Sequence, residues 1–241
     1  MRVIVAPEGA SHDLGELYAF PDAGWVRANL VSTLDGAAVG TDGRSGSINN
    51  DSDTAVFSLQ RAMADAVLVG SNTVSIEGYG RVPLPSAEHV MFGPTTLVVV
   101  SGTASVPEKL LAEDPRGGPV VVLTTEQADA EDVARLRSRL GSDNVWVVGD
   151  GRHVDLELAV RTMASNGLRH VMAEGGPTVF GLLLEQGLVN EVALTWTPTI
   201  VGGSAFRITE GPSLNVPLEL HTLCEHESTL LGLWRVTAEP R

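Results

Sequence analysis

The strongest chemical signal in the sequence is a segment that begins at His170 and reads His-Val-Met-Ala-Glu-Gly-Gly-Pro-Thr-Val-Phe-Gly. Its apolar start predicts a strand that runs into Gly175 and Gly176, and Pro177 suits the first position of a following helix. Such a turn presents backbone N–H groups at the positive end of a helix dipole, and these groups bind phosphate or diphosphate. The alternative is a tight strand-to-helix turn that binds nothing.

A second junction of the same kind follows the apolar run 66–70. Gly70 ends the run, and Asn72 and Thr73 then offer amide, hydroxyl and backbone donors. Ligands collect at the carboxyl ends of parallel strands in an open α/β sheet. Two such junctions therefore predict a dinucleotide-binding site in which each junction contacts one end of the dinucleotide. Neither junction has the Gly-x-Gly-x-x-Gly pattern, so we expect a fold other than the Rossmann domain.

A third candidate is Asp35, which precedes Gly36 at the end of a long apolar run. A carboxylate at the mouth of a strand can orient a polar substrate or relay a proton. An Asp-Gly pair is equally typical of a hairpin turn, so the sequence leaves both interpretations open.

These junctions need a sheet to position them. Apolar runs rich in Val, Leu and Ile predict buried strands at 25–32, 66–70, 96–101, 119–124, 145–149 and 169–174. Helical spacing predicts helices at 52–64, 127–140 and 155–166. Longer strands follow at 190–199, 216–224 and 228–237, the last two joined near Glu225 to Glu227. We therefore expect one α/β domain over 25–241, with a mostly parallel sheet that ends in antiparallel strands and an extended lead-in over 1–24.

The composition excludes several classes of partner. The 241 residues are 43% hydrophobic and 19% charged, and 30 acidic against 16 basic residues give a net charge of −14. This charge argues against nucleic acid and anionic membranes. Lys109 is the only lysine and Cys224 the only cysteine, which excludes a P-loop and disulfide scaffolds. We expect no metal site and no membrane span, and a cytoplasmic location.

Taken together and in order, the motifs resemble one known family. The segments 25–36, 65–74 and 174–178, followed by 189–192, Thr197-Pro198 and Gly202-Gly203, resemble the pyrimidine reductases of riboflavin biosynthesis. The resemblance implies a dihydrofolate-reductase-like, three-layer α/β/α fold. It also implies an NADPH-dependent reductase that opens the ribose of 5-amino-6-(5-phosphoribosylamino)uracil, or of a relative, to a ribityl chain by hydride transfer. Relatives form homodimers, so we expect one here.

The resemblance also implies roles for individual residues. Asp35 and Glu174 would be catalytic and face the substrate and nicotinamide. Residues expected to hold NADPH are Gly70, Asn72 and Thr73 on one side, Gly175, Gly176, Pro177 and Thr178 at the diphosphate, and Ser101 at the 2′-phosphate.

The sequence departs from the family in the half expected to bind substrate. Members usually have a lysine soon after the Asp-Gly, where this chain has Ala37 and Ala38, and an Asp-Asn-Pro segment, where it has 75–81. We expect Tyr79 to stack on a flat heterocycle. The other residues expected to face the substrate are Asn49, Asp53, Glu77 and Arg81. These changes keep two alternatives open: a dihydrofolate or pterin reductase, and a non-catalytic NADPH-binding sensor or partner subunit.

Overall fold

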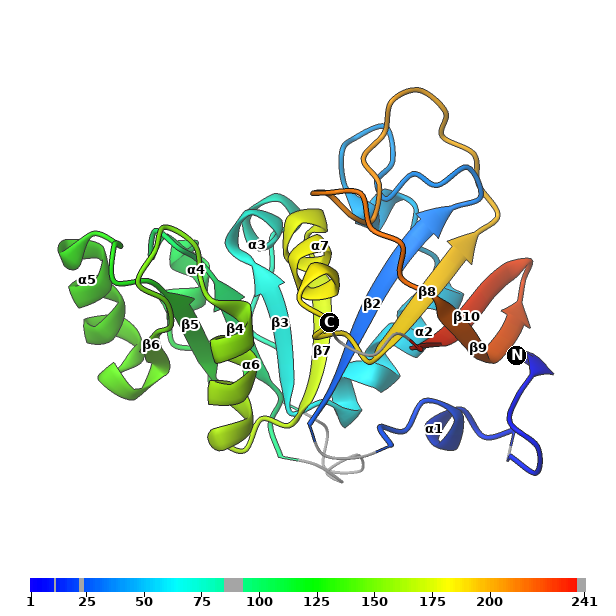
Figure 1. The fold of residues 1–241 in the computed structure, drawn as a ribbon, viewed down its shortest axis with the longest axis horizontal. Helices are drawn as coiled ribbons and strands as arrows, with labels where there is room; N and C mark the ends of the chain where they lie inside the picture. The colour runs from blue at the N-terminus through cyan, green and yellow to red at the C-terminus, as the bar shows by residue number, and fades with distance from the viewer. Residues whose placement is uncertain (11, 22–23, 85–92, 238–241) are drawn as a thin grey trace.

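The computed structural model describes residues 1–10, 12–21, 24–84 and 93–237. Within this part of the chain, ten strands form one sheet in the order β1-β9-β10-β8-β2-β7-β3-β4-β5-β6 (Figure 1). The strands are β1 (Arg2–Val5), β2 (Trp25–Thr33), β3 (Ala66–Gly70), β4 (Thr96–Val100), β5 (Val120–Thr124), β6 (Val145–Val147), β7 (His170–Gly175), β8 (Glu191–Thr197), β9 (Leu218–His226) and β10 (Thr229–Val236).

The sheet is parallel from β8 to β6 and antiparallel at its other end. The antiparallel pairs are β8 with β10, β10 with β9, and β9 with β1. Strand β7 lies between β2 and β3 and pairs with both in parallel. After β3, the strands β4, β5 and β6 are added toward one edge of the sheet, and the chain then returns to the centre to form β7. In open α/β sheets, ligands bind at the carboxyl ends of the strands where the order reverses in this way.

Helices cover both faces of the sheet, which confirms the expected three-layer fold. The helices are α1 (Leu14–Leu17), α2 (Asp51–Met63), α3 (Ser71–Glu77), α4 (Glu108–Leu111), α5 (Ala130–Leu140), α6 (Leu156–Ser165) and α7 (Pro177–Glu185). Side chains alternate along each strand, so Leu68 packs in the cluster with α6 and α7, while Val67 and Val69 pack with α3, α4 and α5. Helices α1 and α2 bury Leu17 and Val56 against the antiparallel strands.

Side-chain caps explain where the predicted helices begin. The side chain of Asn50 accepts a hydrogen bond from the N–H of Asp53, so α2 begins at residue 51. Asp129 caps α5 and Asp155 caps α6 in the same manner. The α5 cap moves the start of that helix to residue 130, three residues after the predicted start.

Two features of the fold correct the expectations. Residues 1–24 are not simply extended, because they contain α1 and the strand β1, which pairs with β9 at the edge of the sheet. The last hairpin turns at Glu227 and Ser228, later than predicted, and both have positive φ angles of 50° and 64°. Consecutive positive φ angles match the right-handed twist of a two-residue hairpin.

A buried ion pair joins the segment after α1 to the centre of the sheet. The Arg27 guanidinium on β2 lies 2.7 Å from the Glu191 carboxylate on β8, and their side chains are 0% and 1% exposed. Arg27 also donates to the carbonyl oxygens of Tyr18 and Ala19. Burial lowers the pKa of Arg27, and the Glu191 carboxylate opposes that shift.

Candidate active site

A cavity of about 620 Å³ opens above the carboxyl ends of β2, β3 and β7. These are the strands at which the order of the sheet reverses. The loop after β2 and the loop after β8 extend over the same edge (Figure 1) and are joined by a hydrogen bond of 2.7 Å from the N–H of Ala38 to the carbonyl of Phe206. The cavity therefore lies where an open α/β sheet binds its ligand.

The two glycine junctions predicted from the sequence meet in this cavity. Gly175 has a φ of +92°, its peptide bond to Gly176 is cis, and Gly176 is the N-cap of α7 with Pro177 at the first helical position. A Cβ atom on Gly176 would collide with the hydroxyl oxygen of Thr73 on α3. The two junctions therefore approach each other closely only because no side chain stands at 176.

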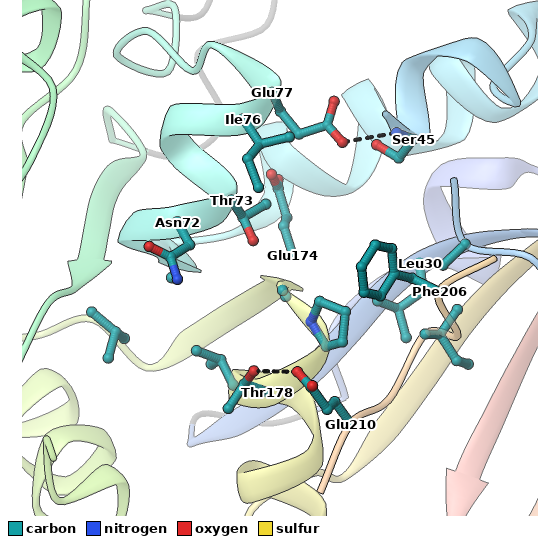
Figure 2. A pocket seen from close by; sticks show the side chains of 18 of the residues that line it. Leu30, Ser45, Asn72, Thr73, Ile76, Glu77, Glu174, Thr178, Phe206 and Glu210 are labelled. Carbon is teal, nitrogen blue, oxygen red and sulfur yellow. Dashed lines mark hydrogen bonds between the residues drawn. The ribbon is translucent and has the colours of Figure 1, made fainter. Parts of the chain in front are cut away.

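Most of the residues expected to hold the cofactor line the cavity. Figure 2 shows Asn72 and Thr73 on α3, across the cavity from Thr178 on α7. The full set of expected cofactor residues at the cavity is Gly70, Asn72, Thr73, Gly175, Gly176, Pro177 and Thr178. The cradle of N–H groups, hydroxyls and missing side chains at the start of α7 fits a diphosphate.

Ser101 does not line the cavity. Its side chain is buried, and its hydroxyl donates to the carbonyl of Ser105 at 2.8 Å. The structure therefore leaves Ser101 without a hydroxyl free for a 2′-phosphate. His153 lines the cavity instead, from the segment between β6 and α6, and no motif in the sequence pointed to it.

Glu174 lines the cavity, but both of its oxygens already accept charge-assisted hydrogen bonds. Arg61 donates to both oxygens at 2.6 Å, and the Tyr79 hydroxyl donates to one of them at 2.7 Å. Burial and the negative Glu174 raise the pKa of Tyr79 well above its ordinary value. Burial opposes charge on Arg61, yet the Glu174 carboxylate raises the pKa of Arg61. The three groups form a neutralised cluster, so the geometry favours a positioning role for Glu174 over proton exchange.

Tyr79 lines the cavity as expected, whereas Arg81 does not. The Tyr79 ring lines the cavity with its hydroxyl held by Glu174, and the Arg61 guanidinium lies 5.4 Å from the ring centroid. Arg81 is outside the cavity and donates to the carbonyl oxygens of Leu110 and Gly118. Of these two residues, Tyr79 therefore supports Glu174, and Arg81 supports the fold.

Asp35 also lies outside the cavity. Its carboxylate accepts hydrogen bonds from the Thr33 hydroxyl and from the N–H groups of Val201 and Gly202. These bonds lower the pKa of Asp35, with that from Thr33 the largest cause. Gly36 has a φ of +88° in the turn. Asp35 lies in a turn that joins the end of β2 to the loop after β8. Because β2 pairs in parallel with both of its neighbours, this turn is not the hairpin that the sequence also allowed.

The remaining predicted substrate residues line the other part of the cavity. Asn49, Asp53 and Glu77 are there with the ring of Phe57. Glu77 accepts a 2.8 Å hydrogen bond from the N–H of Ser45, as Figure 2 shows. Asp53 is 5% exposed, and burial raises its pKa while a hydrogen bond with Thr195 opposes the shift.

Sequence reasoning missed the contribution of the loop after β8. Phe206, Ile208 and Glu210 from this loop line the cavity, and Glu210 accepts a 2.9 Å hydrogen bond from the Thr178 hydroxyl (Figure 2). The part of the loop over 206–210 has no apolar period and none of the motifs noted in the sequence, so only its packing on α7 reveals its place. Among the described residues, no group of three His, Cys, Asp or Glu side chains could hold a metal ion. None of the helices in that part of the chain is long and apolar enough to cross a membrane.

Residues 24–231, which include every strand of the cavity, match the RibD C-terminal domain family. The chain belongs to this family. Among curated relatives, the 2,5-diamino-6-ribosylamino-4(3H)-pyrimidinone 5′-phosphate reductase of Methanothermobacter thermautotrophicus is 32% identical over 74% of this chain and 80% of its own length. The reductase of the same name from Archaeoglobus fulgidus is 29% identical over 74% of this chain and 82% of its own.

Solved structures of the RibD C-terminal domain type share the fold. A pyrimidine reductase-like protein from Corynebacterium diphtheriae has a TM-score of 0.74 at 22% identity and covers 89% of this chain and 92% of its own. The riboflavin biosynthesis reductase Rib7 of yeast has a TM-score of 0.64 at 17% identity over 95% and 94% of the two chains. The chain spans about half the length of RibD relatives, such as 47% of that from Chlamydia muridarum. The protein is therefore an oxidoreductase domain of the pyrimidine reductase type.

Proposed function

We propose that this protein reduces a phosphorylated ribosylaminopyrimidine to its ribityl form by direct hydride transfer from NADPH, as a step of riboflavin synthesis. The observation that carries the proposal is the match to curated reductases across most of their own length. The two glycine junctions at one cavity support it independently, because they suit a dinucleotide that supplies the hydride. In this proposal the protein positions the two reacting carbons and balances the change in charge.

The proposed cofactor site uses the residues that line the α7 side of the cavity. Gly175, Gly176, Pro177 and Thr178 hold the diphosphate at the start of α7. Gly70, Asn72 and Thr73 support the cofactor from β3 and α3. NADPH supplies the hydride when bound. We prefer it over NADH by analogy with the reductase family.

The proposed substrate site is the part of the cavity around Asn49, Asp53 and Glu77. The sequence led us to the uracil form of the pyrimidine, whereas the archaeal relatives are named for the 2,5-diamino form. The two rings differ at C2, which carries an amino group in the diamino form and a carbonyl oxygen in the uracil. We propose the diamino compound as the first substrate to test, because those relatives match this chain over most of their length.

A homodimer and a cytoplasmic location are also proposals. Leu218 and Leu220 on β9 are 44% and 37% exposed, and Ile4 on the edge strand β1 is 47% exposed. Exposed apolar side chains at one end of a sheet are compatible with a second copy there. Sedimentation analysis of the purified protein measures the oligomeric state directly.

The test of the proposed function is the oxidation of NADPH by the purified protein with each of the two pyrimidines, with dihydrofolate as a parallel substrate. We expect turnover with a pyrimidine and formation of its ribityl product, identified by mass. Turnover of dihydrofolate alone would favour a pterin reductase. NADPH binding without turnover of any of the three would favour the non-catalytic alternative.

A further inference from the structure

Four carboxyl groups line the cavity in the described residues, and their environments differ. They belong to Asp53, Glu77, Glu174 and Glu210. Glu174 is held by Arg61 and Tyr79, and Glu77 accepts from the N–H of Ser45. Glu210 is exposed and accepts from the Thr178 hydroxyl. Each of these three is ion-paired, hydrogen-bonded by a backbone donor, or exposed.

Asp53 has a different setting. It lies in the first turn of α2, its backbone N–H is fixed by the Asn50 side chain, and the residue is 5% exposed. Its side chain forms a hydrogen bond with Thr195 of β8, and within the described part of the chain no cation shifts its pKa. A buried carboxyl group without a cation favours its protonated form.

Among the described residues, the polar groups that face Asp53 from neighbouring elements include a hydroxyl and a phenol. Thr195 lies on β8, and Tyr18 follows α1 with a phenol whose pKa is raised by its own burial. His226 of β9 contacts the adjacent residue Ser52, with its Nδ1 atom 2.9 Å from the Ser52 hydroxyl. Because burial is the largest cause of the shift, the pKa of Asp53 lies above the ordinary aspartate value.

The proposed reduction requires one proton for each hydride. When the ribose ring of a ribosylamine opens, it forms an imine, in which C1′ of the sugar is doubly bonded to the nitrogen attached to the pyrimidine ring. When a hydride from the reduced nicotinamide adds to C1′, the C–N π electrons move to that nitrogen, which must gain a proton. The nicotinamide is oxidised, C1′ is reduced, and the acid that gave the proton is then reprotonated from water.

We propose that Asp53 is the catalytic acid that donates this proton to the imine nitrogen. The proposal rests on the proposed reductase function, and it replaces Asp35 and Glu174 as the candidates for proton transfer. Asp35 is outside the cavity, and both Glu174 oxygens are bound. Asp53 lines the cavity beside Asn29, Asn49 and Phe57, where a pyrimidine would lie between polar groups and one aromatic face.

The kinetic test compares Asp53→Asn with Asp51→Asn, which alters an exposed aspartate of the same helix turn outside the cavity. A general acid works only while protonated, so wild-type kcat should fall as pH rises through the Asp53 pKa in the complex. Asp53→Asn should lower kcat by about 10²–10⁴-fold and abolish this fall, while Asp51→Asn keeps the wild-type rate and profile. Asp53→Glu should restore part of kcat together with the pH dependence. A higher KM with an unchanged pH profile would overturn the proposal, because it would make Asp53 a binding group only.

A second measurement does not depend on turnover. In protein labelled with ¹³C at aspartate carboxyls, the signal that disappears in Asp53→Asn should titrate above the ordinary aspartate value. A signal that titrates at or below that value would overturn the proposal, even if the enzyme reduces the pyrimidine. If the wild-type protein turns over no substrate while the Asp53 signal titrates above the ordinary aspartate value, the proposed function fails. The assignment of Asp53 as the acid of that reaction then fails with it, although the pKa of the carboxyl is raised.

Discussion

Glu210 places a carboxylate beside the first turn of the helix that we propose for the diphosphate. Its Oε2 atom lies 2.9 Å from the Thr178 hydroxyl, and its N–H donates to the carbonyl of Pro177. A bound diphosphate would bring a second negative charge to the same helix end, and two such charges about 4 Å apart repel by about 1 kcal/mol in water.

We therefore expect Glu210→Gln to bind NADPH about fivefold more tightly, because the amide still accepts from Thr178 without the charge. Titration of NADPH fluorescence measures the affinity, and Glu185→Gln, at the other end of α7, is the matched control. Weaker binding to Glu210→Gln would indicate that the carboxylate supports the cofactor instead.

At the scale of elements, the approach of α3 to α7 depends on Gly176. A side chain at this position would collide with Thr73, whereas a Cβ on Gly46, in the loop after β2, would meet nothing within 4 Å. We expect Gly176→Leu to weaken NADPH binding about 10-fold or more, since overpacking costs about 1–3 kcal/mol.

Calorimetric titration with NADPH tests this, with Gly46→Ala as the control for general effects of losing a glycine. Circular dichroism checks that the Gly176→Leu protein is folded. Full affinity in a folded Gly176→Leu protein would contradict the placement of the diphosphate at α7.

The buried Arg27–Glu191 ion pair links β2 to β8. Arg27→Met leaves the buried Glu191 carboxylate with the partly exposed Arg235 guanidinium, 3.4 Å away, in place of its buried partner. The free energy of unfolding should therefore fall by an amount toward the lower end of about 3–5 kcal/mol. Arg235 also contacts Glu191 but is 43% exposed, so Arg235→Met should cost about 1 kcal/mol or less. Urea denaturation measures both. Equal losses of unfolding free energy in the two variants would indicate that burial does not make the Arg27–Glu191 pair more important than the Arg235–Glu191 contact.

At the scale of the whole molecule, the net charge of −14 opposes the approach of an anionic cofactor. Added salt screens this repulsion over about 10 Å at 0.1 M. We expect the KM for NADPH to fall about twofold or more as ionic strength rises from low values to 0.1 M, because long-range charge acts mainly on association. Steady-state kinetics at constant pH measures it. A rising KM would show that local cations outweigh the field of the whole protein.

The sequence by itself determined the layers of the fold and the two glycine junctions. Strand runs such as 66–70 and 96–101 are continuous and apolar because both faces are covered, so their positions follow from local composition. The strand β1 was not predictable, because four residues at a sheet edge carry no period of their own and depend on β9. The helix α4 has only four residues, which are too few to show a helical period of apolar residues.

Only the tertiary structure decided which polar side chains share the cavity. Asp35, Glu174 and Asp53 all stand near strand ends or helix starts, and nothing in their spacing separates their roles. Asp35 is bound by a loop 166 residues away in sequence, Glu174 by Arg61 and Tyr79 from other elements, and Asp53 is buried against β8. The protonation and availability of a carboxyl group depend on its burial and its partners, and in this protein the partners that separate the three carboxyls come from distant parts of the chain.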